Sequence, residues 1–243
     1  MPKDEIYRAD GGPLAPFEFN DAVAEVFPDM LQRSIPGYAA SIDAIGQLAA
    51  RYVSTGSNCY DLGCSLGAAT LAMRRNVAVK GCQIVAVDNS DAMVERCRRI
   101  VASVPENPDV VVSVLCADVR NVEIRNASMV VLNYTLQFLP VQDRLSLLKK
   151  IASGMVDGGV LILSEKVVDE DPAIEKLLVE LHLQFKRSNA YSELEISRKR
   201  AALENVLVPE TVQHHVARLK QAGFRHAGPW LRYYNFVSIL ALR

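Results

Sequence analysis

Short runs that are apolar at nearly every position, alternating with helical patterns, constrain the fold of this chain more than any other feature. After Gly56 these runs predict strands at 58–62, 83–87, 110–115, 127–132 and 159–164. Continuous rather than alternating hydrophobicity indicates burial on both faces, which is typical of a parallel sheet covered by helices. Helices are predicted between the strands at 68–77, 91–101 and 141–155. With right-handed crossovers, these elements predict a doubly wound α/β fold.

The N-terminal segment, residues 1–54, precedes this core and has a different composition. Residues 1–20 are rich in Pro, Gly and charge, and predict a loose arm. Asp21 is expected to cap a short helix, which Pro28 would end or interrupt. Apolar residues at spacings of three and four predict a further helix over residues 42–52.

The C-terminal third departs from the strand and helix alternation. Residues 167–208 are helical in pattern without a strand, and predict an inserted helical cap. A helix at 212–221 and strand-like runs near 228–233 and 236–241 close the chain. We therefore expect residues 1–243 to form a single domain.

Composition excludes several classes of function. Half of the 243 residues are hydrophobic, which is enough for one large core. The 27 basic and 28 acidic residues leave a net charge of −1, so no direct contact with nucleic acid is expected. Neither a signal-peptide pattern nor an apolar run of about 18 residues occurs, which predicts a cytoplasmic protein that does not enter a membrane. The five cysteines lack CxxC spacing and predict reduced thiols, with no metal.

The loop after the first predicted strand reads Asp61-Leu-Gly63-Cys-Ser65-Leu-Gly67. Glycine is needed where a Cβ would collide with an approaching ligand. A glycine loop between a strand and a helix is typical of nucleotide-binding folds. Because Ser65 replaces the middle glycine of the usual fingerprint, the loop alone also fits a tight turn without a ligand.

Polar side chains follow the next three strands. A carboxylate at Asp88 can accept the hydroxyl protons of a ribose, whereas capping of the next helix would explain Ser90 or Asp91 but not Asp88. Asp118 can accept the amino group of adenine, and the amide of Asn133 can bind an amino-acid group or a backbone carbonyl. Since the carboxyl ends of parallel strands meet at one edge of the sheet, these residues together predict a nucleoside site there.

These residues resemble the class I S-adenosyl-methionine-dependent methyltransferases over about 55–165 and again over 212–243. The resemblance implies a seven-stranded sheet whose last strand is antiparallel. Further segments resemble a narrower family, the carboxy-S-adenosyl-methionine synthases of bacterial transfer-RNA wobble-uridine modification. They are Val23-Ala-Glu-Val-Phe-Pro-Asp-Met30, Arg33-Ser34 with Pro36-Gly-Tyr38, Tyr60-Asp-Leu-Gly-Cys-Ser65 with Gly67-Ala-Ala-Thr70, Asn126-Ala-Ser-Met-Val-Val131, Thr135-Leu-Gln-Phe-Leu139, and Tyr191-Ser-Glu-Leu-Glu195 with Lys199-Arg200. Residues 1–16 carry no such likeness.

The narrower resemblance implies a reaction other than methyl transfer. Members of that family move a carboxylate from prephenate to the methyl carbon of S-adenosyl-methionine and release phenylpyruvate and water. The hydroxide that leaves prephenate serves as the base, so no strong protein base is needed. The sequence is consistent with this, because its four histidines all lie late in the chain, outside the strand-edge loops. The resemblance also implies a homodimer and a downstream tRNA carboxymethyltransferase that uses the product.

By the same resemblance, individual residues receive expected roles. Arg200 grips the transferred carboxylate and Tyr38 closes over the sulfonium end, while Arg187 is a further candidate for a prephenate carboxylate. The residues expected to hold the rest of the nucleoside are Gly63, Cys64 and Ser65 at the methionine end, Asp88 and Asn89 at the ribose, Asp118 and Val119 at adenine, and Asn133 near the sulfur.

Two alternatives remain open at this point. The first is a conventional methyltransferase that acts on a small acidic molecule, with the same fold and the same cofactor. The second is a binding module without catalytic activity that accompanies a tRNA-modifying enzyme. A carboxylate-binding Arg beside the methyl group favours the synthase over the methyltransferase, which has no use for it.

Overall fold

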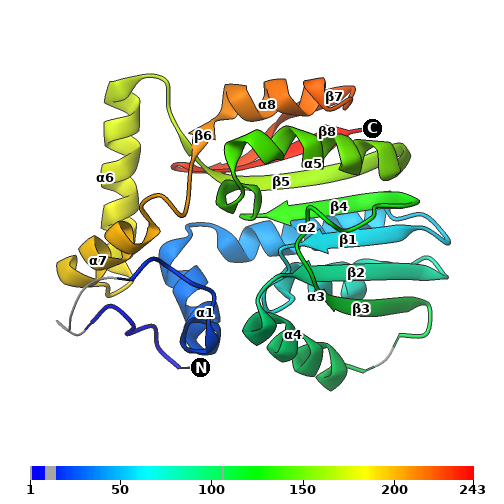
Figure 1. Ribbon diagram of the computed structural model, residues 1–243, viewed down its shortest axis with the longest axis horizontal. Helices are drawn as coiled ribbons and strands as arrows, with labels where there is room; N and C mark the ends of the chain where they lie inside the picture. Colours follow the sequence, from blue (N-terminus) through cyan, green and yellow to red (C-terminus); the bar gives the residue numbers. More distant parts are fainter. Residues whose placement is uncertain (1, 9–14, 106) are drawn as a thin grey trace.

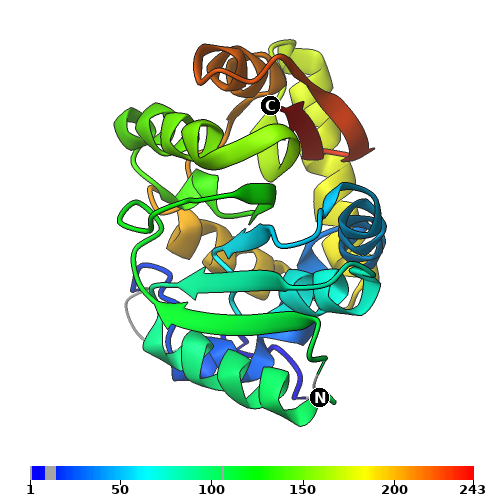
Figure 2. The same ribbon diagram turned by 90° about the vertical axis from the view of Figure 1, so that its right-hand side faces the viewer.

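The computed structural model describes residues 2–8, 15–105 and 107–243, and its centre is one twisted sheet (Figures 1 and 2). Along the sheet the strand order is β3-β2-β1-β4-β5-β8-β7. Their bounds are β1 Asn58–Leu62, β2 Cys82–Asp88, β3 Val110–Cys116, β4 Ala127–Asn133, β5 Met155–Val168, β7 His226–Tyr233 and β8 Phe236–Leu242. The five predicted parallel strands are all present, and β8 is antiparallel to both β5 and β7. The predicted seven-stranded sheet with an antiparallel last strand is confirmed.

An additional strand was not predicted. The two-residue β6, Glu210–Thr211, pairs in parallel with the end of β5, beyond the region that the other strands share. Two residues are too few to show a hydrophobic pattern, and β6 therefore leaves no recognisable trace in the sequence.

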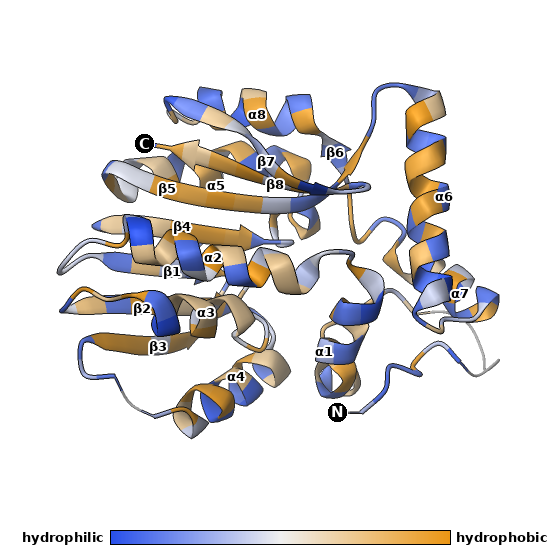
Figure 3. Cartoon of the chain, turned by 180° about the vertical axis from the view of Figure 1, so that it is seen from behind, coloured by the Kyte–Doolittle hydropathy of each residue, from blue (hydrophilic) through white to orange (hydrophobic). Residues whose placement is uncertain are grey.

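Helices cover both faces of the sheet. Their bounds are α2 Tyr38–Tyr52, α3 Ala68–Asn76, α4 Asp91–Ser103, α5 Val141–Gly154 and α8 Val212–Gln221. On one face α5 and α8 pack over a core that includes Val85 and Val87, while α2 and α3 pack on the other face with Ile84. Because successive side chains of a strand point to opposite faces, every position of β2 except Gln83 is buried, as the apolar run predicted. Figure 3 shows the resulting hydrophobic colour along the central strands.

The first helix, α1 Asp21–Ser34, corrects two expectations. Its N-cap is Asn20, whose side chain accepts a hydrogen bond from the Val23 N–H, and Asp21 is the first helical residue. Pro28 neither ends nor interrupts the helix. Proline costs one backbone hydrogen bond inside a helix, but the apolar face that includes Phe27 and Met30 is buried, and this packing retains the helix.

The arm is also more ordered than expected, at least over residues 2–8. Asp4 is almost fully buried and its backbone N–H donates to Asp29 of α1 at 2.7 Å. The Asp4 carbonyl accepts from the Arg33 guanidinium at 3.0 Å. The prediction of a loose arm was therefore wrong for this part, and residues 9–14 lie outside the described residues.

The cap consists of α6 Pro172–Ser188 and α7 Glu193–Leu203, as predicted. Ser192 and Glu195 form a capping box that fixes the start of α7. The carboxyl ends of the parallel strands point towards the side of the molecule where α1, α6 and α7 lie (Figures 1 and 3). Among the described residues, none of the helices is both long and apolar enough to span a membrane.

Candidate functional site

The loop after β1 turns sharply at the carboxyl edge of the sheet. Gly63 and Gly67 have positive φ angles of 85° and 84°, and Ser65 has one of 48°. The N–H groups of Gly63 and Cys64 both donate to the Val87 carbonyl, at 2.8 and 2.9 Å. A left-handed serine is uncommon, and the loop retains it because neighbouring hydrogen bonds fix the backbone.

Gly63 is required because another loop lies against it. A Cβ at this position would lie 2.2 Å from Oγ1 of Thr135, in the segment that follows β4. No side chain fits at that separation, so the loops after β1 and β4 touch directly. The expected convergence of these two strand ends is thus present in the structure.

Asp88 lies at the end of β2 and links two loops. Its carboxylate accepts from the Ser65 N–H at 2.9 Å and from the Ser90 N–H at 3.0 Å. Burial raises the pKa of Asp88, and these backbone donors oppose that shift. Ser90, not Asp88, caps α4 by accepting from the Met93 N–H at 3.2 Å. Asn89 stands exposed beside Asp88.

At the third strand end, the carboxylate of Asp118 is already paired. Arg120 donates to both of its oxygens, with a shortest separation of 2.6 Å, and also to Asp143. The Arg120 hydrogen bonds lower the pKa of Asp118, so this group is ionised well into the acidic range. Val119 next to it is buried. An adenine amino group would share Asp118 with Arg120 rather than meet a free carboxylate.

Two buried oxygens at the ends of β1 and β4 have no hydrogen-bond partner among the described residues, and Oδ1 of Asn235 after β7 is a third such oxygen. The first two are Oδ1 of Asp61 in β1 and Oδ1 of Asn133 at the end of β4. The other oxygen of Asp61 accepts from the N–H and hydroxyl of Thr70, at 2.9 and 2.6 Å. Burial raises the pKa of Asp61 to about 6, partly offset by the Thr70 bonds. Buried polar atoms without partners are costly, so their presence points to a ligand that satisfies them.

A pair of partly buried tyrosines, Tyr38 and Tyr134, adjoins these oxygens. Burial raises the pKa of Tyr38, with a further contribution from the Asp61 carboxylate. Burial also raises the pKa of Tyr134, to which Tyr38 and Glu165 add. Tyr134 has a positive φ of 62°, directly after Asn133. Tyr38 therefore lies near Asp61 of β1 and Tyr134 after β4, and its expected role at the sulfonium end stays a prediction.

Glu165 of β5 binds the backbone of the segment that follows β4. Its two carboxylate oxygens accept from the N–H groups of Leu136 and Gln137, at 3.0 and 2.9 Å. Complete burial raises its pKa to about 8, while Arg144 opposes the shift. Glu165 thereby fixes the start of the short 3-10 helix Leu136–Phe138, adjacent to Asn133 and Tyr134.

The cap contributes cations to the same edge of the sheet. Arg200 of α7 is exposed, and it acts electrostatically on Lys166 of β5 and Lys186 of α6. Arg187, in contrast, is about half exposed and forms an ion pair with Glu193. The structure thus brings Arg200 into a cluster of cations and leaves Arg187 paired at the surface.

Sequence patterns did not identify Tyr134, Glu165 or Lys186. Tyr134 directly follows Asn133, and this adjacency was an available signal. Glu165 is a charged residue within an apolar segment, where an ionisable group needs a partner or a function, and that contrast was visible in the sequence. Lys186 lies beside Arg187 in a polar stretch, and nothing in the sequence pattern marked it.

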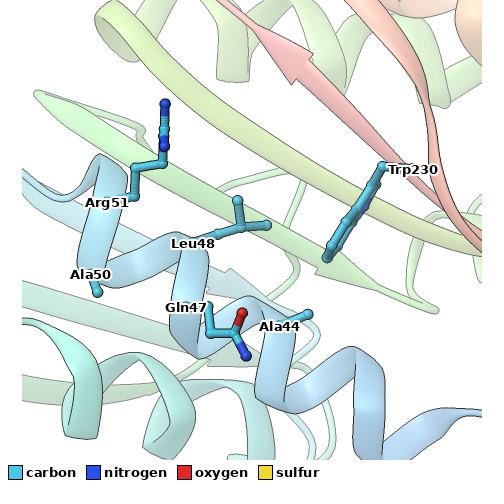
Figure 4. A pocket seen from close by; sticks show the side chains of 6 residues that line it. All are labelled: Ala44, Gln47, Leu48, Ala50, Arg51 and Trp230. Atoms are coloured by element: carbon cyan, nitrogen blue, oxygen red, sulfur yellow. The ribbon is translucent and has the colours of Figure 1, made fainter.

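Surface hollows lie away from this edge or at its margin. One of about 430 Å³ lies between α2 and β7, where Figure 4 shows the Trp230 ring facing Leu48. Another of about 490 Å³ includes Asn89 and Ser90, together with residues 18–21. Among the described residues, no group of three or more His, Cys, Asp or Glu side chains is arranged to hold a metal ion. The expected absence of a metal stays a prediction.

Comparisons with known proteins concern the fold and the family of this chain. Residues 60–159 match the methyltransferase domain family. The fold is also similar to a solved candidate S-adenosyl-L-methionine-dependent methyltransferase from Methanococcus maripaludis, with a TM-score of 0.60 at 19% identity. That alignment covers 96% of this chain and 97% of the other. At this identity the likeness shows the fold alone.

Two curated relatives are much more similar. A carboxy-S-adenosyl-L-methionine synthase of Geobacter sp. (strain M21) is 52% identical over 240 residues, covering 99% of this chain and 98% of the relative. A synthase of the same name from Shewanella sediminis is 51% identical over 242 residues, with the same coverage of both chains. These alignments include the cap and α1 as well as the strand edge.

Proposed function

This chain belongs to the family of carboxy-S-adenosyl-L-methionine synthases, and on that premise we propose that it makes carboxy-S-adenosyl-L-methionine from S-adenosyl-L-methionine and prephenate. The chain is an enzyme of this family, and the similarity covers 99% of its length, so it includes the cap as well as the sheet. The identity of the carboxylate donor and the residues that bind it are the parts we propose.

The proposed reaction balances with these two substrates alone. Prephenate loses its ring carboxyl group as carbon dioxide and its ring hydroxyl as hydroxide, and becomes phenylpyruvate. The hydroxide removes a proton from the S-methyl group and becomes water, leaving a sulfonium ylide. The ylide carbon then forms a bond to the carbon of carbon dioxide. Neither an oxidant nor a protein base of high pKa is required.

One observation carries the assignment of the nucleoside site: where the ends of β1 and β4 meet, the buried Oδ1 atoms of Asp61 and Asn133 have no hydrogen-bond partner in the part of the chain that the structure describes. The amino group and the polarised methyl group of S-adenosyl-L-methionine can supply positive partners there. Tyr38 would close this end from α2, where an aromatic face suits a sulfonium. The remaining contacts would come from Gly63, Cys64 and Ser65 at the methionine part, Asp88 and Asn89 at the ribose, and Asp118 and Val119 at adenine.

Arg200 is proposed to bind the transferred carboxylate. Its guanidinium has no ion pair or hydrogen bond among the described residues, and its planar fork suits a carboxylate. His182 and His215 are poorly suited to act as bases here. Burial lowers the pKa of His182 to about 3 and that of His215 to about 4, so both bind a proton only weakly at pH 7.

Incubation of the protein with S-adenosyl-L-methionine and prephenate, followed by mass analysis, tests the proposal. Replacement of one hydrogen by a carboxyl group on the nucleoside, together with phenylpyruvate, is the expected result. Formation of S-adenosyl-homocysteine and a methylated acid would instead support a conventional methyltransferase. A mixture without prephenate is the control, and in it the nucleoside should stay unchanged.

We also propose that the chain forms a homodimer through α6. Ile174 and Leu177 of this helix are 43% and 49% exposed, and Figure 3 shows hydrophobic colour along α6, which stands beside the sheet. A second copy could cover this face. Cytoplasmic location, a downstream tRNA carboxymethyltransferase as the user of the product, and the lack of direct nucleic-acid contact stay predictions.

A further inference from the structure

Lys186 of α6 is a buried cation that the folded chain does not neutralise. Its exposed fraction is 9%, and among the described residues its ammonium group has no hydrogen bond or ion pair. Burial, together with the nearby charges of Lys199, Lys166 and Arg200, lowers its pKa to about 7. A lysine is seldom buried without a partner, because the loss of hydration is not compensated.

In the part of the chain that the structure describes, the neighbouring acidic groups are engaged elsewhere and do not pair with Lys186. Asp4 is the nearby acid, and it is occupied: its carboxylate pairs with Lys199 at 3.3 Å and also accepts from the Tyr191 hydroxyl. Glu175 attracts Lys166, but its carboxylate accepts from the Asp169 N–H at 2.8 Å. His182 is neutral for the reason given above.

Lys199 shows what a structural lysine looks like in this region. It is 5% exposed, and it donates to Asp4, to Ser34 Oγ at 3.0 Å and to the Tyr191 hydroxyl at 3.4 Å. Lys186 and Lys166 lack all such partners among the described residues. The ammonium groups of Lys186 and Lys166 can therefore bind an anion, whereas that of Lys199 is engaged by groups of the chain.

The cluster also adjoins the reactive end of the nucleoside site. The His182 ring, one turn from Lys186 on α6, packs edge-on against Phe236 with centroids 4.9 Å apart. Phe236 in turn packs against Tyr134 at 5.9 Å. Tyr134 follows Asn133 directly and interacts with Tyr38. Lys166 follows Glu165, which holds the same loop. A molecule that reacts near Tyr38 can thus reach the lysines.

We propose that Lys186 and Lys166 form a second carboxylate-binding subsite, which holds the carboxylate that the donor keeps while Arg200 holds the one it transfers. A dianionic donor such as prephenate would then be bound at both ends. The inference rests on the proposed function, and it assigns to Lys186 the role that sequence reasoning gave to its neighbour Arg187.

Steady-state kinetics of Lys186→Met test the subsite. Loss of a charge-assisted hydrogen bond predicts a rise of about 10- to 100-fold in KM for prephenate. Inhibition by phenylpyruvate, which carries only the retained carboxylate, should weaken by a similar factor. Affinity for S-adenosyl-L-methionine should stay within about twofold of wild type. The matched control is Lys176→Met, an exposed lysine of the same helix, with unchanged kinetics.

Thermal unfolding of the ligand-free protein separates binding from a structural role. Since Lys186 is an unpaired buried cation, Lys186→Met should raise Tm, whereas a structural lysine would lower it on removal. Lys166→Gln gives a second kinetic test if Lys186→Met does not fold. Unchanged KM and unchanged phenylpyruvate inhibition in a folded variant would overturn the inference. Absence of carboxylated product from wild type would instead overturn the proposed function.

Discussion

The strand edge and the cap build their halves of the site in different ways. At the strand edge, short loops and backbone N–H groups do most of the work, as where Asp88 accepts from Ser65 and Ser90. At the cap, side-chain charges from distant segments meet, as where Asp4 pairs with Lys199, 195 residues away. We propose that the first half binds the nucleoside, and it lies within the residues that match the methyltransferase domain family. The second half is where a particular second substrate can be selected.

Breaking the cap's own ion pair should have the largest effect on stability. Asp4→Asn leaves Lys199 buried beside Arg33 without its counter-charge. Loss of one partner of a buried pair costs about 3–5 kcal/mol, which urea unfolding would measure. The control is Glu5→Gln, in which an exposed pair with Arg8 is lost at a cost below about 1 kcal/mol. Equal stability of the two variants would mean that the arm does not hold the cap.

At the strand edge, Asp88→Ala should abolish most nucleoside affinity. The substitution removes an ionised acceptor for the ribose and also releases the Ser65 N–H, so we expect affinity for S-adenosyl-L-methionine to fall about 100-fold. Isothermal titration calorimetry measures this directly. Asp91→Ala, at the exposed start of α4, is the matched control and should bind normally. Retained affinity in Asp88→Ala would place the nucleoside elsewhere.

For the cap, the contrast with the strand edge predicts the opposite result: a substitution there should impair carboxyl transfer and spare nucleoside affinity. Arg200→Ala should reduce carboxyl transfer by about 10- to 100-fold while nucleoside affinity stays unchanged. Arg200→Lys should recover little, because an ammonium cannot replace the bidentate fork. Arg187→Ala is the control, and its surface pair with Glu193 predicts less than a twofold effect. A large effect of Arg187→Ala would instead restore this residue as a donor contact.

The same contrast explains what the sequence could predict. The strands and the residues after them were predictable, because burial on both faces leaves continuous apolar runs and polar ends. The burial of Asp4 was not, because its partners Tyr191 and Lys199 lie far along the chain. The burial of polar side chains on the inward face of α6 was also not predictable from the sequence. This helix buries His182 and Lys186 and exposes Ile174 and Leu177, which reverses the usual hydrophobic pattern.

The last prediction concerns the pH dependence of stability and involves Glu165, a buried carboxyl group at the strand edge. Its pKa rises from 4.5 to about 8 on folding, so the folded state binds the extra proton between these values. Stability should therefore fall as pH rises from about 4.5 to 8, and stay lower above that range. Glu165→Gln cannot ionise and should flatten this part of the profile. It keeps only one of the two acceptors for Leu136 and Gln137, so at pH 4.5 it should be less stable than wild type by about 1 kcal/mol. Urea unfolding at several pH values measures both changes. If the pH profiles of stability of wild type and Glu165→Gln stay parallel, Glu165 is not the group that titrates. The loop after Asn133 is then bound by an ionised Glu165 carboxylate.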